Sequence, residues 1–390
     1  MNRPGYLERI ARAFDLHPVV TVLGPRQSGK TTLARQYAAQ CADFAAATNH
    51  FDLEDPQDLA RLAEPKLALQ GLRGLVLIDE VQRTPELFPL LRVLVDRPDN
   101  PARFLILGSA SRDLIHQSSE SLAGRIGHLE VRPFCVGEVG LDQLERLWLR
   151  GGFPRAFLAE SEVKVFKWLE DYTLTFLERD LPQLGFRIPA RSLRRFWMML
   201  THVHGNVLNS SELARSFGTS DTTIRRYLDL LEGTFMLRLL PPWHENLGKR
   251  QVKAPKVYFR DSGLLHCLLG IQREDQLRTH LKLGASWEGF ALEEVIRAAG
   301  AKDGEVYFWG VHQQGELDLL LFADGRRLGY EFKYTDRPTM TRALQQAIDL
   351  LGLETLTVIH PGDKEFPLAE RAAAVPLGLV LERLHRVGAS

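Results

Sequence analysis

The sequence predicts an α/β protein in which a parallel-sheet domain is followed by a helical, winged-helix module and then by a second α/β domain. Three observations predict this order. An apolar run, a Gly-rich loop and a helical pattern open the chain, two short helices with a Gly turn lie in its middle, and an acidic hairpin pattern lies near its end. A chain of 390 residues is long enough for two or three cores. We expect domains at residues 1–150, 151–270 and 271–390.

Composition narrows the class of protein before any motif is considered. Hydrophobic residues make up 45% and charged residues 25%, which excludes wholesale disorder and a membrane bundle. No apolar run approaches the roughly 18 residues that a membrane helix needs, and the first residues lack the apolar segment of a secretory signal. Cys41, Cys135 and Cys267 are too far apart in sequence for a typical disulfide framework or cysteine zinc site. We therefore expect a cytoplasmic protein with no membrane partner.

The first motif is a phosphate-binding loop. The apolar run 19–23 predicts a strand, GPRQSGKT follows at 24–31, and a helical pattern continues to Tyr37. The glycines let the backbone wrap phosphate oxygens, the Lys30 ammonium reaches the β and γ phosphates, and the Thr31 hydroxyl is offered to Mg²⁺. The residues expected to bind ATP here are Gly24, Pro25, Arg26, Gln27, Ser28, Gly29, Lys30, Thr31 and Thr32.

A second apolar run, LVLIDE at 75–80, ends in two acids. After a phosphate loop, such a strand end predicts that Asp79 completes the Mg²⁺ shell and that Glu80 polarises the attacking water. The alternative is that the two carboxylates only cap the next helix.

Two further residues are candidates in this domain. Ser109 follows the apolar run 104–107, and at the carboxyl end of a parallel strand it could sense the γ-phosphate; its alternative role is to cap the next helix. Arg125, in LAGR at 122–125, could act as an arginine finger from the same subunit or from a neighbour. Its alternative role is that of an ordinary solvated surface arginine.

These motifs carry a resemblance to a known family. GPRQSGKT, LVLIDE, LILGSAS, SLAGR, GGFPRAF, LERDL and the later KAPKVYFRDSGLL are together similar to a prokaryotic family of AAA-type ATPases. The resemblance implies a C-terminal domain of originally unknown function with a nuclease-like fold. It also implies that Lys30, Thr31, Asp79 and Glu80 form the nucleotide site and that Arg125 is the family's recurrent arginine.

The middle of the chain predicts a long helix over 164–181 and then a helix-turn-helix. The first short helix begins after Asn209, a Gly-containing turn lies at 217–220, and the second helix covers 221–231. The run 235–240 could be the strand of a wing. Early in the second helix, where base edges and phosphates would be met, lie Thr222, Thr223, Arg225 and Arg226.

Charge is segregated although the whole chain is neutral. Residues 187–260 contain thirteen Lys and Arg against five Asp and Glu, a local excess of +8. Such a patch is typical of polyanion binding, and it makes DNA the favoured partner. The alternative is that the winged helix is a structural or protein-docking module.

The third motif is a hairpin with acids on one face. Asp324-Gly325 predicts a two-residue turn that sets Ala323 opposite Arg326. Counting outward then places Asp318 opposite Glu331 and Glu316 opposite Lys333. The opposite, apolar face would hold Leu317, Leu319, Leu321, Leu328, Tyr330 and Phe332.

Two opposed carboxylates should repel unless a cation lies between them, and Mg²⁺ bound by Asp318 and Glu331 would suit. Asp318, Glu331 and Lys333 resemble the PD-(D/E)xK nuclease pattern, in which the lysine would activate water. That superfamily adds an acid from the preceding helix; Glu288 is preferred, with Glu293 and Glu294 as rivals. The alternative is a surface salt bridge between Glu316 and Lys333.

The leading hypothesis is a DNA-associated ATPase in which ATP and Mg²⁺ drive rearrangement of the winged helix and the nuclease-like domain on DNA. Two alternatives stay open. One is a STAND-like signalling ATPase switch with protein partners and an inactive nuclease-like domain. The other is a metal-dependent nuclease whose ATPase gates access. An arginine finger acting between subunits would require a homo-oligomer.

Overall fold

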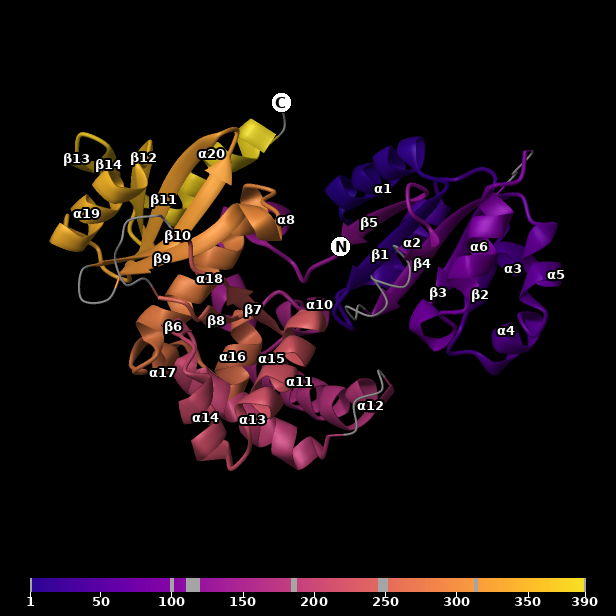
Figure 1. Cartoon of the computed structure of the whole chain (residues 1–390), viewed down its shortest axis with the longest axis horizontal. Helices are drawn as coiled ribbons and strands as arrows, with labels where there is room; N and C mark the ends of the chain where they lie inside the picture. The colour runs from indigo at the N-terminus through magenta and orange to yellow at the C-terminus, as the bar shows by residue number, and fades with distance from the viewer. Residues whose placement is uncertain are drawn as a thin grey trace. The chain divides into compact units, whose positions relative to one another are not determined.

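The computed structural model describes residues 2–98, 102–109, 120–183, 188–244, 252–311 and 315–388. The chain divides into two compact units, one of Met1–Pro133 with Gly233–Phe235 and one of Phe134–Glu232 with Met236–Ser390 (Figure 1). Within the described residues, no helix is both long and apolar enough to cross a membrane.

The first unit is built on a five-stranded parallel sheet in the order β2-β3-β4-β1-β5. The strands are β1 (Val19–Gly24), β2 (His50–Asp52), β3 (Gly74–Asp79), β4 (Ala102–Ser109) and β5 (Ile126–Glu130). The α-helices in the described part of this unit include α1 (Pro4–Leu16), α2 (Lys30–Ala38), α3 (Ala46–Asn49), α4 (Pro56–Arg61), α5 (Pro65–Gln70) and α6 (Leu87–Val95). The predicted α/β class is thus confirmed.

Both faces of this sheet are covered, which explains why its strands are apolar throughout. Val20, Leu77 and Leu105 pack against α1 and α2 on one face. Val76 and Phe104 point the other way and pack against α4, α5 and α6. Because all strands run in parallel, their carboxyl ends meet at one edge, where ligands bind in open α/β sheets.

The second unit begins earlier than the boundary expected at residue 150. Phe134 and Trp148 pack into one core with Trp287 of the long helix α18 (Leu283–Ala298). Residues 134–150, which were expected to belong to the first domain, therefore contribute apolar side chains to the core of the second unit. Its helices before residue 184 include α8 (Val136–Val139), α9 (Leu144–Arg150), α10 (Pro154–Phe157) and α11 (Glu162–Thr175).

The predicted pair of short helices is present as α14 (Ser210–Phe217) and α15 (Asp221–Gly233). Asn209 caps α14 by accepting the Glu212 N–H at 3.1 Å, and Gly218 ends it at a φ of 78°, which glycine adopts without a Cβ clash. Around the pair lie α13 (Ala190–Val203), β6 (Asn206–Val207), β7 (Leu237–Leu240) and β8 (Lys256–Phe259). These strands form an antiparallel sheet in the order β6-β8-β7, with β8 in the centre.

The last domain is a six-stranded mixed sheet in the order β13-β14-β12-β11-β10-β9. Its strands are β9 (Val306–Val311), β10 (Gly315–Ala323), β11 (Arg326–Phe332), β12 (Thr355–His360), β13 (Phe366–Ala369) and β14 (Ala372–Pro376). Strands β9, β10 and β11 are antiparallel, whereas β11 and β12 are parallel and are joined through α19 (Arg342–Leu351). Its other helices include α16 (Ser262–Leu269), α17 (Glu274–Arg278) and α20 (Leu377–Gly388), which precede and follow the sheet in sequence.

The hairpin register is as predicted from Ala323 to Leu319. Ala323 pairs with Arg326 and Leu319 with Tyr330, and the turn residues Asp324 and Gly325 have φ values of 51° and 76°. The assignment of Leu317 to the face of Leu319 was wrong. The pairing of β10 with β9 shifts register between Leu317 and Leu320, because β10 has one extra residue there. As a result, the Leu317 side chain packs in the core on one face of the sheet, and that of Leu319 packs in the core on the other face.

Candidate functional site

The candidate nucleotide site is the loop between β1 and α2. Gln27 and Gly29 have φ values of 65° and 92°, left-handed conformations that turn successive backbone N–H groups toward one side. A Cβ on Gly24 would lie 2.0 Å from the Val131 carbonyl oxygen, so only glycine fits at the start of the loop. The first-turn N–H groups of α2 have no carbonyl partner in the helix and are available to an anion.

Lys30 lies within this loop and is 6% exposed. Its Nζ donates to the carbonyl oxygens of Gly24 at 3.0 Å and Pro25 at 2.8 Å. The ammonium thus lies on the loop that is predicted to wrap phosphate. Thr32, also expected at the site, is exposed on the first turn of α2.

The residues predicted to share Mg²⁺ are in contact. Thr31 Oγ1 donates to Asp79 Oδ2 at 2.8 Å, and Asp79 is 3% exposed. Burial raises the pKa of Asp79, while the Thr31 hydrogen bond lowers it. A hydroxyl and a carboxylate side by side at the end of a phosphate loop are oxygen donors of the kind Mg²⁺ takes together with waters and substrate phosphate, so these residues fit the ion.

Glu80 follows Asp79 in a left-handed conformation, with a φ of 57°. It accepts a hydrogen bond from Gln82 Nε2 and lies 3.8 Å from the Arg26 guanidinium, which also pairs with Glu54 at 3.1 Å. The Glu80 carboxylate is therefore oriented by side chains from the phosphate loop and from the turn after β3.

Ser109 lies at the carboxyl end of β4, paired in register with Gly24. Its backbone N–H donates to Gln82 Oε1 at 3.2 Å, so one glutamine side chain connects Ser109 with Glu80. The buried hydroxyls of Ser109 and Ser28 have no hydrogen-bond partner within the described part of the chain. Unsatisfied buried hydroxyls beside a phosphate loop fit a ligand with several oxygens. Residues 110–119, which follow Ser109 and include the start of the helix that it was predicted to cap, lie outside the described residues.

Arg125 is not brought to this site. Its carbonyl accepts the Val19 N–H at 3.2 Å, and Val19 pairs with Ile126, so Arg125 lies at the amino end of β1. The phosphate loop follows the carboxyl end of that six-residue strand, roughly 17 Å away at about 3.3 Å per residue. Arg125 Nε pairs with Asp96 Oδ1 at 2.5 Å instead. The register therefore disfavours a finger acting within the same subunit.

The second candidate site is the acidic hairpin, and an internal cation lies in it. Lys256 of β8 is 2% exposed, and its Nζ lies 2.8 Å from Asp318 Oδ1, 2.5 Å from Glu316 Oε1 and 3.7 Å from Glu288 Oε1. Burial lowers the pKa of Lys256, but the neighbouring carboxylates outweigh it and raise that pKa well above its ordinary value. Positive charge is therefore supplied by ammonium groups rather than by one bridging ion, because Lys256 pairs with Asp318 whereas Glu331 pairs with Lys333.

The remaining oxygens of the acidic pair are also engaged. Asp318 Oδ2 accepts the Phe332 N–H at 3.1 Å, Glu331 Oε2 accepts the Asp318 N–H at 3.3 Å, and Glu331 Oε1 pairs with Lys333 at 2.7 Å. Burial and the Asp318 charge raise the pKa of Glu331 to about 8. Burial raises the pKa of Asp318, but the positive charge of Lys256 outweighs this effect, so the pKa of Asp318 lies below its ordinary value.

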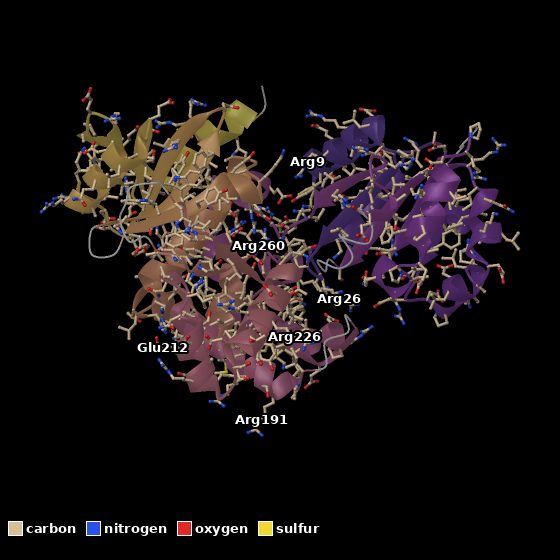
Figure 2. The ribbon with its side chains drawn as sticks, in the orientation of Figure 1. Arg9, Arg26, Arg191, Glu212, Arg226 and Arg260 are labelled. Carbon is tan, nitrogen blue, oxygen red and sulfur yellow. The ribbon has the colours of Figure 1, made fainter. Side chains whose placement is uncertain are left out.

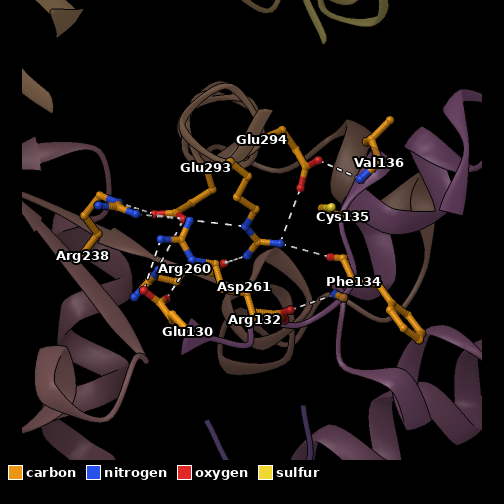
Figure 3. Close-up of polar contacts among 12 residues, drawn as sticks. Glu130, Arg132, Phe134, Cys135, Val136, Arg238, Arg260, Asp261, Glu293 and Glu294 are labelled. Atoms are coloured by element: carbon orange, nitrogen blue, oxygen red, sulfur yellow. Dashed lines mark hydrogen bonds and ion pairs between the residues drawn. The ribbon is translucent and has the colours of Figure 1, made fainter. Parts of the chain in front are cut away.

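Of the three acids considered on α18, only Glu288 reaches this cluster, where it accepts the Tyr258 hydroxyl at 2.6 Å. Burial, followed by repulsion from Asp318, raises the pKa of Glu288 to about 7. Glu293 instead pairs with Arg238, and Glu294 accepts the Val136 N–H at 2.7 Å (Figure 3).

The nuclease-type carboxylates do not fit a divalent metal as they stand. Lys256 fills the point on which Glu288, Glu316 and Asp318 converge, and both oxygens of Asp318 and of Glu331 already have protein partners. Among the described residues, no three Asp, Glu, His or Cys side chains are arranged to hold a metal ion.

Sequence reasoning missed two residues. Gln82, which bridges Glu80 and Ser109, carries no motif signal beyond its place two residues after Glu80. Lys256 lies in KAPKVYFRDSGLL, a segment that contributes to the family resemblance but contains no known metal or catalytic motif. A buried lysine in an apolar strand needs a charged partner, and that was the available signal.

The basic excess of the helix-turn-helix module is partly internal. Arg238, Lys256 and Arg260 pair with Glu293 or Asp318. At the surface, Thr222, Arg225 and Arg226 of α15 are exposed, and Arg191 extends away from the ribbon (Figure 2). Fewer positive charges therefore lie at the surface of this module than the sequence count of +8 suggests. Those at the surface include Arg225 and Arg226 of the second helix.

Family models match three segments of the chain. Residues 16–140 match an AAA domain, and residues 141–275 and 283–380 match two domains of unknown function. A solved structure, the Walker-type ATPase of Pyrococcus abyssi, is 16% identical, with a TM-score of 0.47 over 69% of this chain and 95% of its own.

Two curated proteins, each described as an uncharacterized protein, come from Mycobacterium bovis and Mycobacterium tuberculosis. Each is 50% identical over 373 residues, which is 96% of this chain and 83% of the relative. The chain belongs to the same family as these mycobacterial proteins and carries an AAA-type P-loop ATPase domain.

Proposed function

We propose that the protein hydrolyses ATP at the β1–α2 loop and uses this cycle to act on DNA through its helix-turn-helix module. The contact of Thr31 with Asp79, 2.8 Å apart beside Lys30, carries the first part of the proposal. Mg²⁺, when bound, supplies charge neutralisation at the transferring phosphate. Thr31 and Asp79 would hold the ion, Lys30 and the loop N–H groups would bind the phosphates, and Glu80 would take the proton of the attacking water.

The exposed residues of α15 support DNA as the partner. The order α13, β6, α14, α15, β7, β8 with an antiparallel three-stranded sheet is consistent with a winged helix. Its second helix has Ile224 and Leu228 buried, while Thr222, Arg225 and Arg226 are exposed. Arginines at such positions neutralise phosphates and reach base edges in the major groove.

Duplex DNA is expected to bind the protein and to raise its ATP turnover, with Lys30→Ala as the inactive blank. The double variant Arg225→Glu/Arg226→Glu should bind DNA about tenfold or more weakly and show a shallower salt dependence, because two phosphate contacts are lost. Fluorescence anisotropy against salt concentration measures binding, and phosphate release measures turnover. Arg342→Glu, an exposed arginine on α19, is the matched control. Equal DNA affinity of the double variant and the control would remove α15 from the proposal.

Arg125 is proposed to act on the nucleotide of a second subunit. Arg125→Ala should then slow hydrolysis by about tenfold or more, and mixing it with Lys30→Ala should restore part of the rate. Asp96→Ala breaks the same ion pair and serves as the control. If Asp96→Ala and Arg125→Ala behave alike and mixing restores nothing, the arginine has only the small structural role of an exposed pair.

A specific observation favours a second candidate, an ATPase switch with a protein partner and an inactive C-terminal domain. Lys256 fills the carboxylate cluster that cleavage would require. This candidate predicts slow hydrolysis that single-stranded, duplex and branched DNA leave unchanged, whereas the leading proposal predicts stimulation by at least one of them.

A further inference from the structure

We infer that the Lys256 ammonium is the resident cation of the nuclease-like domain, replacing a divalent metal and closing the site to metal-dependent cleavage. The inference concerns the second unit alone and is independent of the ATPase proposal. The carboxylate pattern resembles a metal site, but protein donors already occupy the oxygens of Asp318 and Glu331.

The position of Lys256 is set by its strand. β8 is the central strand of its sheet, with Lys256 paired to Leu240 of β7 on one side and to Val207 of β6 on the other. A strand hydrogen-bonded along both edges cannot carry its side chain away without breaking two ladders. The backbone of Lys256 is therefore fixed, and the burial of its side chain, which is 2% exposed, keeps the ammonium beside Asp318.

The cluster around the ammonium resembles a cation shell. Oxygens of Glu316, Asp318 and Glu288 lie 2.5, 2.8 and 3.7 Å from Nζ and come from β10 and α18. An ammonium can donate three hydrogen bonds and carries one positive charge, so it holds the oxygens of Glu316 and Asp318 and attracts that of Glu288 without releasing them to a metal. Mg²⁺ and Mn²⁺ need the same oxygens at roughly 2.0–2.2 Å, which the nitrogen blocks.

Removing the ammonium should create a metal site. In Lys256→Ala, the oxygens of Glu316, Asp318 and Glu288 would converge on an empty position with excess negative charge. A divalent cation relieves the repulsion that the lysine relieves in the native chain. The lysine is thus the specific group that separates this domain from a metal-binding one.

The test is a Mn²⁺ titration of the full chain without nucleotide, with free Mn²⁺ measured by electron paramagnetic resonance. We expect Lys256→Ala to gain one Mn²⁺ site, bound about tenfold or more tightly than any Mn²⁺ on the wild type. Lys256→Ala/Asp318→Asn should lose the gained site. Lys253→Ala, an exposed lysine three residues earlier, should match the wild type.

Two measurements need no change at Lys256, so they hold even if that variant fails to fold. The Mn²⁺ isotherms of the wild type and Asp318→Asn should coincide, and neither protein should cleave single-stranded or duplex DNA faster than the other with Mg²⁺ or Mn²⁺. Mn²⁺ binding or cleavage that the wild type has and Asp318→Asn lacks would overturn the inference. So would a folded Lys256→Ala protein that gains no Mn²⁺ site.

Discussion

Glu80→Gln is expected to slow ATP hydrolysis by about 10²- to 10³-fold while ATP binding stays within about threefold of the wild type. The glutamine keeps the size of the side chain and its hydrogen bond with Gln82, but it cannot take a proton from water. Lys30, Thr31 and Asp79, which are proposed to hold the nucleotide and Mg²⁺, are untouched. Phosphate release measures turnover, and a fluorescent ATP analogue measures binding.

The matched control is Glu86→Gln, an exposed glutamate six residues later whose removal should leave turnover unchanged. Lys30→Ala should behave differently from Glu80→Gln, because it removes a phosphate ligand and should weaken ATP binding as well as turnover. If Glu80→Gln retained more than about a third of the wild-type rate, another group would have to orient the attacking water.

Glu293→Gln is expected to lower the free energy of unfolding of the second unit by about 3 to 5 kcal/mol. The Glu293 side chain is 3% exposed, and Arg238 donates to its Oε2 at 3.2 Å. Arg260 and Arg297 lie 3.8 and 4.0 Å from the same oxygen. A neutral amide would leave three half-buried or buried guanidinium groups without this shared carboxylate.

Tryptophan fluorescence during urea unfolding measures this loss selectively, because all six tryptophans lie in the second unit. The exposed Glu382 on α20 supplies a control, and Glu382→Gln should change stability by less than about 0.5 kcal/mol. Replacing both members of the pair, Arg238→Met/Glu293→Met, should recover part of the loss because the most buried of the three guanidinium groups is then removed together with its carboxylate. A loss in Glu293→Gln below about 1 kcal/mol would contradict the importance of the cluster.

The same variant has a defined pH dependence. Burial raises the pKa of Glu293, but Arg238 and then Arg260 outweigh it and lower that pKa well below its ordinary value. A lowered pKa stabilises the folded state above the unfolded pKa and loses this contribution as pH falls through the folded pKa. The difference between wild type and Glu293→Gln should therefore be constant above about pH 5 and shrink below about pH 4.

Much of the ATPase domain could be predicted because its chemistry depends on short-range order. A strand, a Gly-rich loop and a helix must follow one another for Lys30 and Thr31 to face the same phosphates. Asp79 could be placed beside Thr31 because the carboxyl ends of parallel strands meet at one edge, and the two are in contact. The exclusion of Arg125 needed the register of β5 against β1, which local sequence does not specify.

In the acidic hairpin, too, local sequence predicts the pairing of neighbouring residues but not the pairing with a more distant strand. Its turn and the register from Ala323 to Leu319 followed from Asp324-Gly325 and alternation, whereas the extra residue near Asp318 depended on pairing with β9. The need for positive charge beside Asp318 and Glu331 could be argued from charge repulsion alone. The sequence does not say that two ammonium groups supply it, Lys256 at Asp318 and Lys333 at Glu331.

Local pattern therefore determined the phosphate loop, the acids that follow β3, the two short helices and the hairpin, because each depends on residues close together in the chain. Tertiary structure alone decided which distant side chains became partners. Lys256 reaches Asp318 across 62 residues, and Gln82 reaches Ser109 across 27. In the interior, a buried charge must find its counter-charge wherever the fold brings one, and only the packed chain determines that choice.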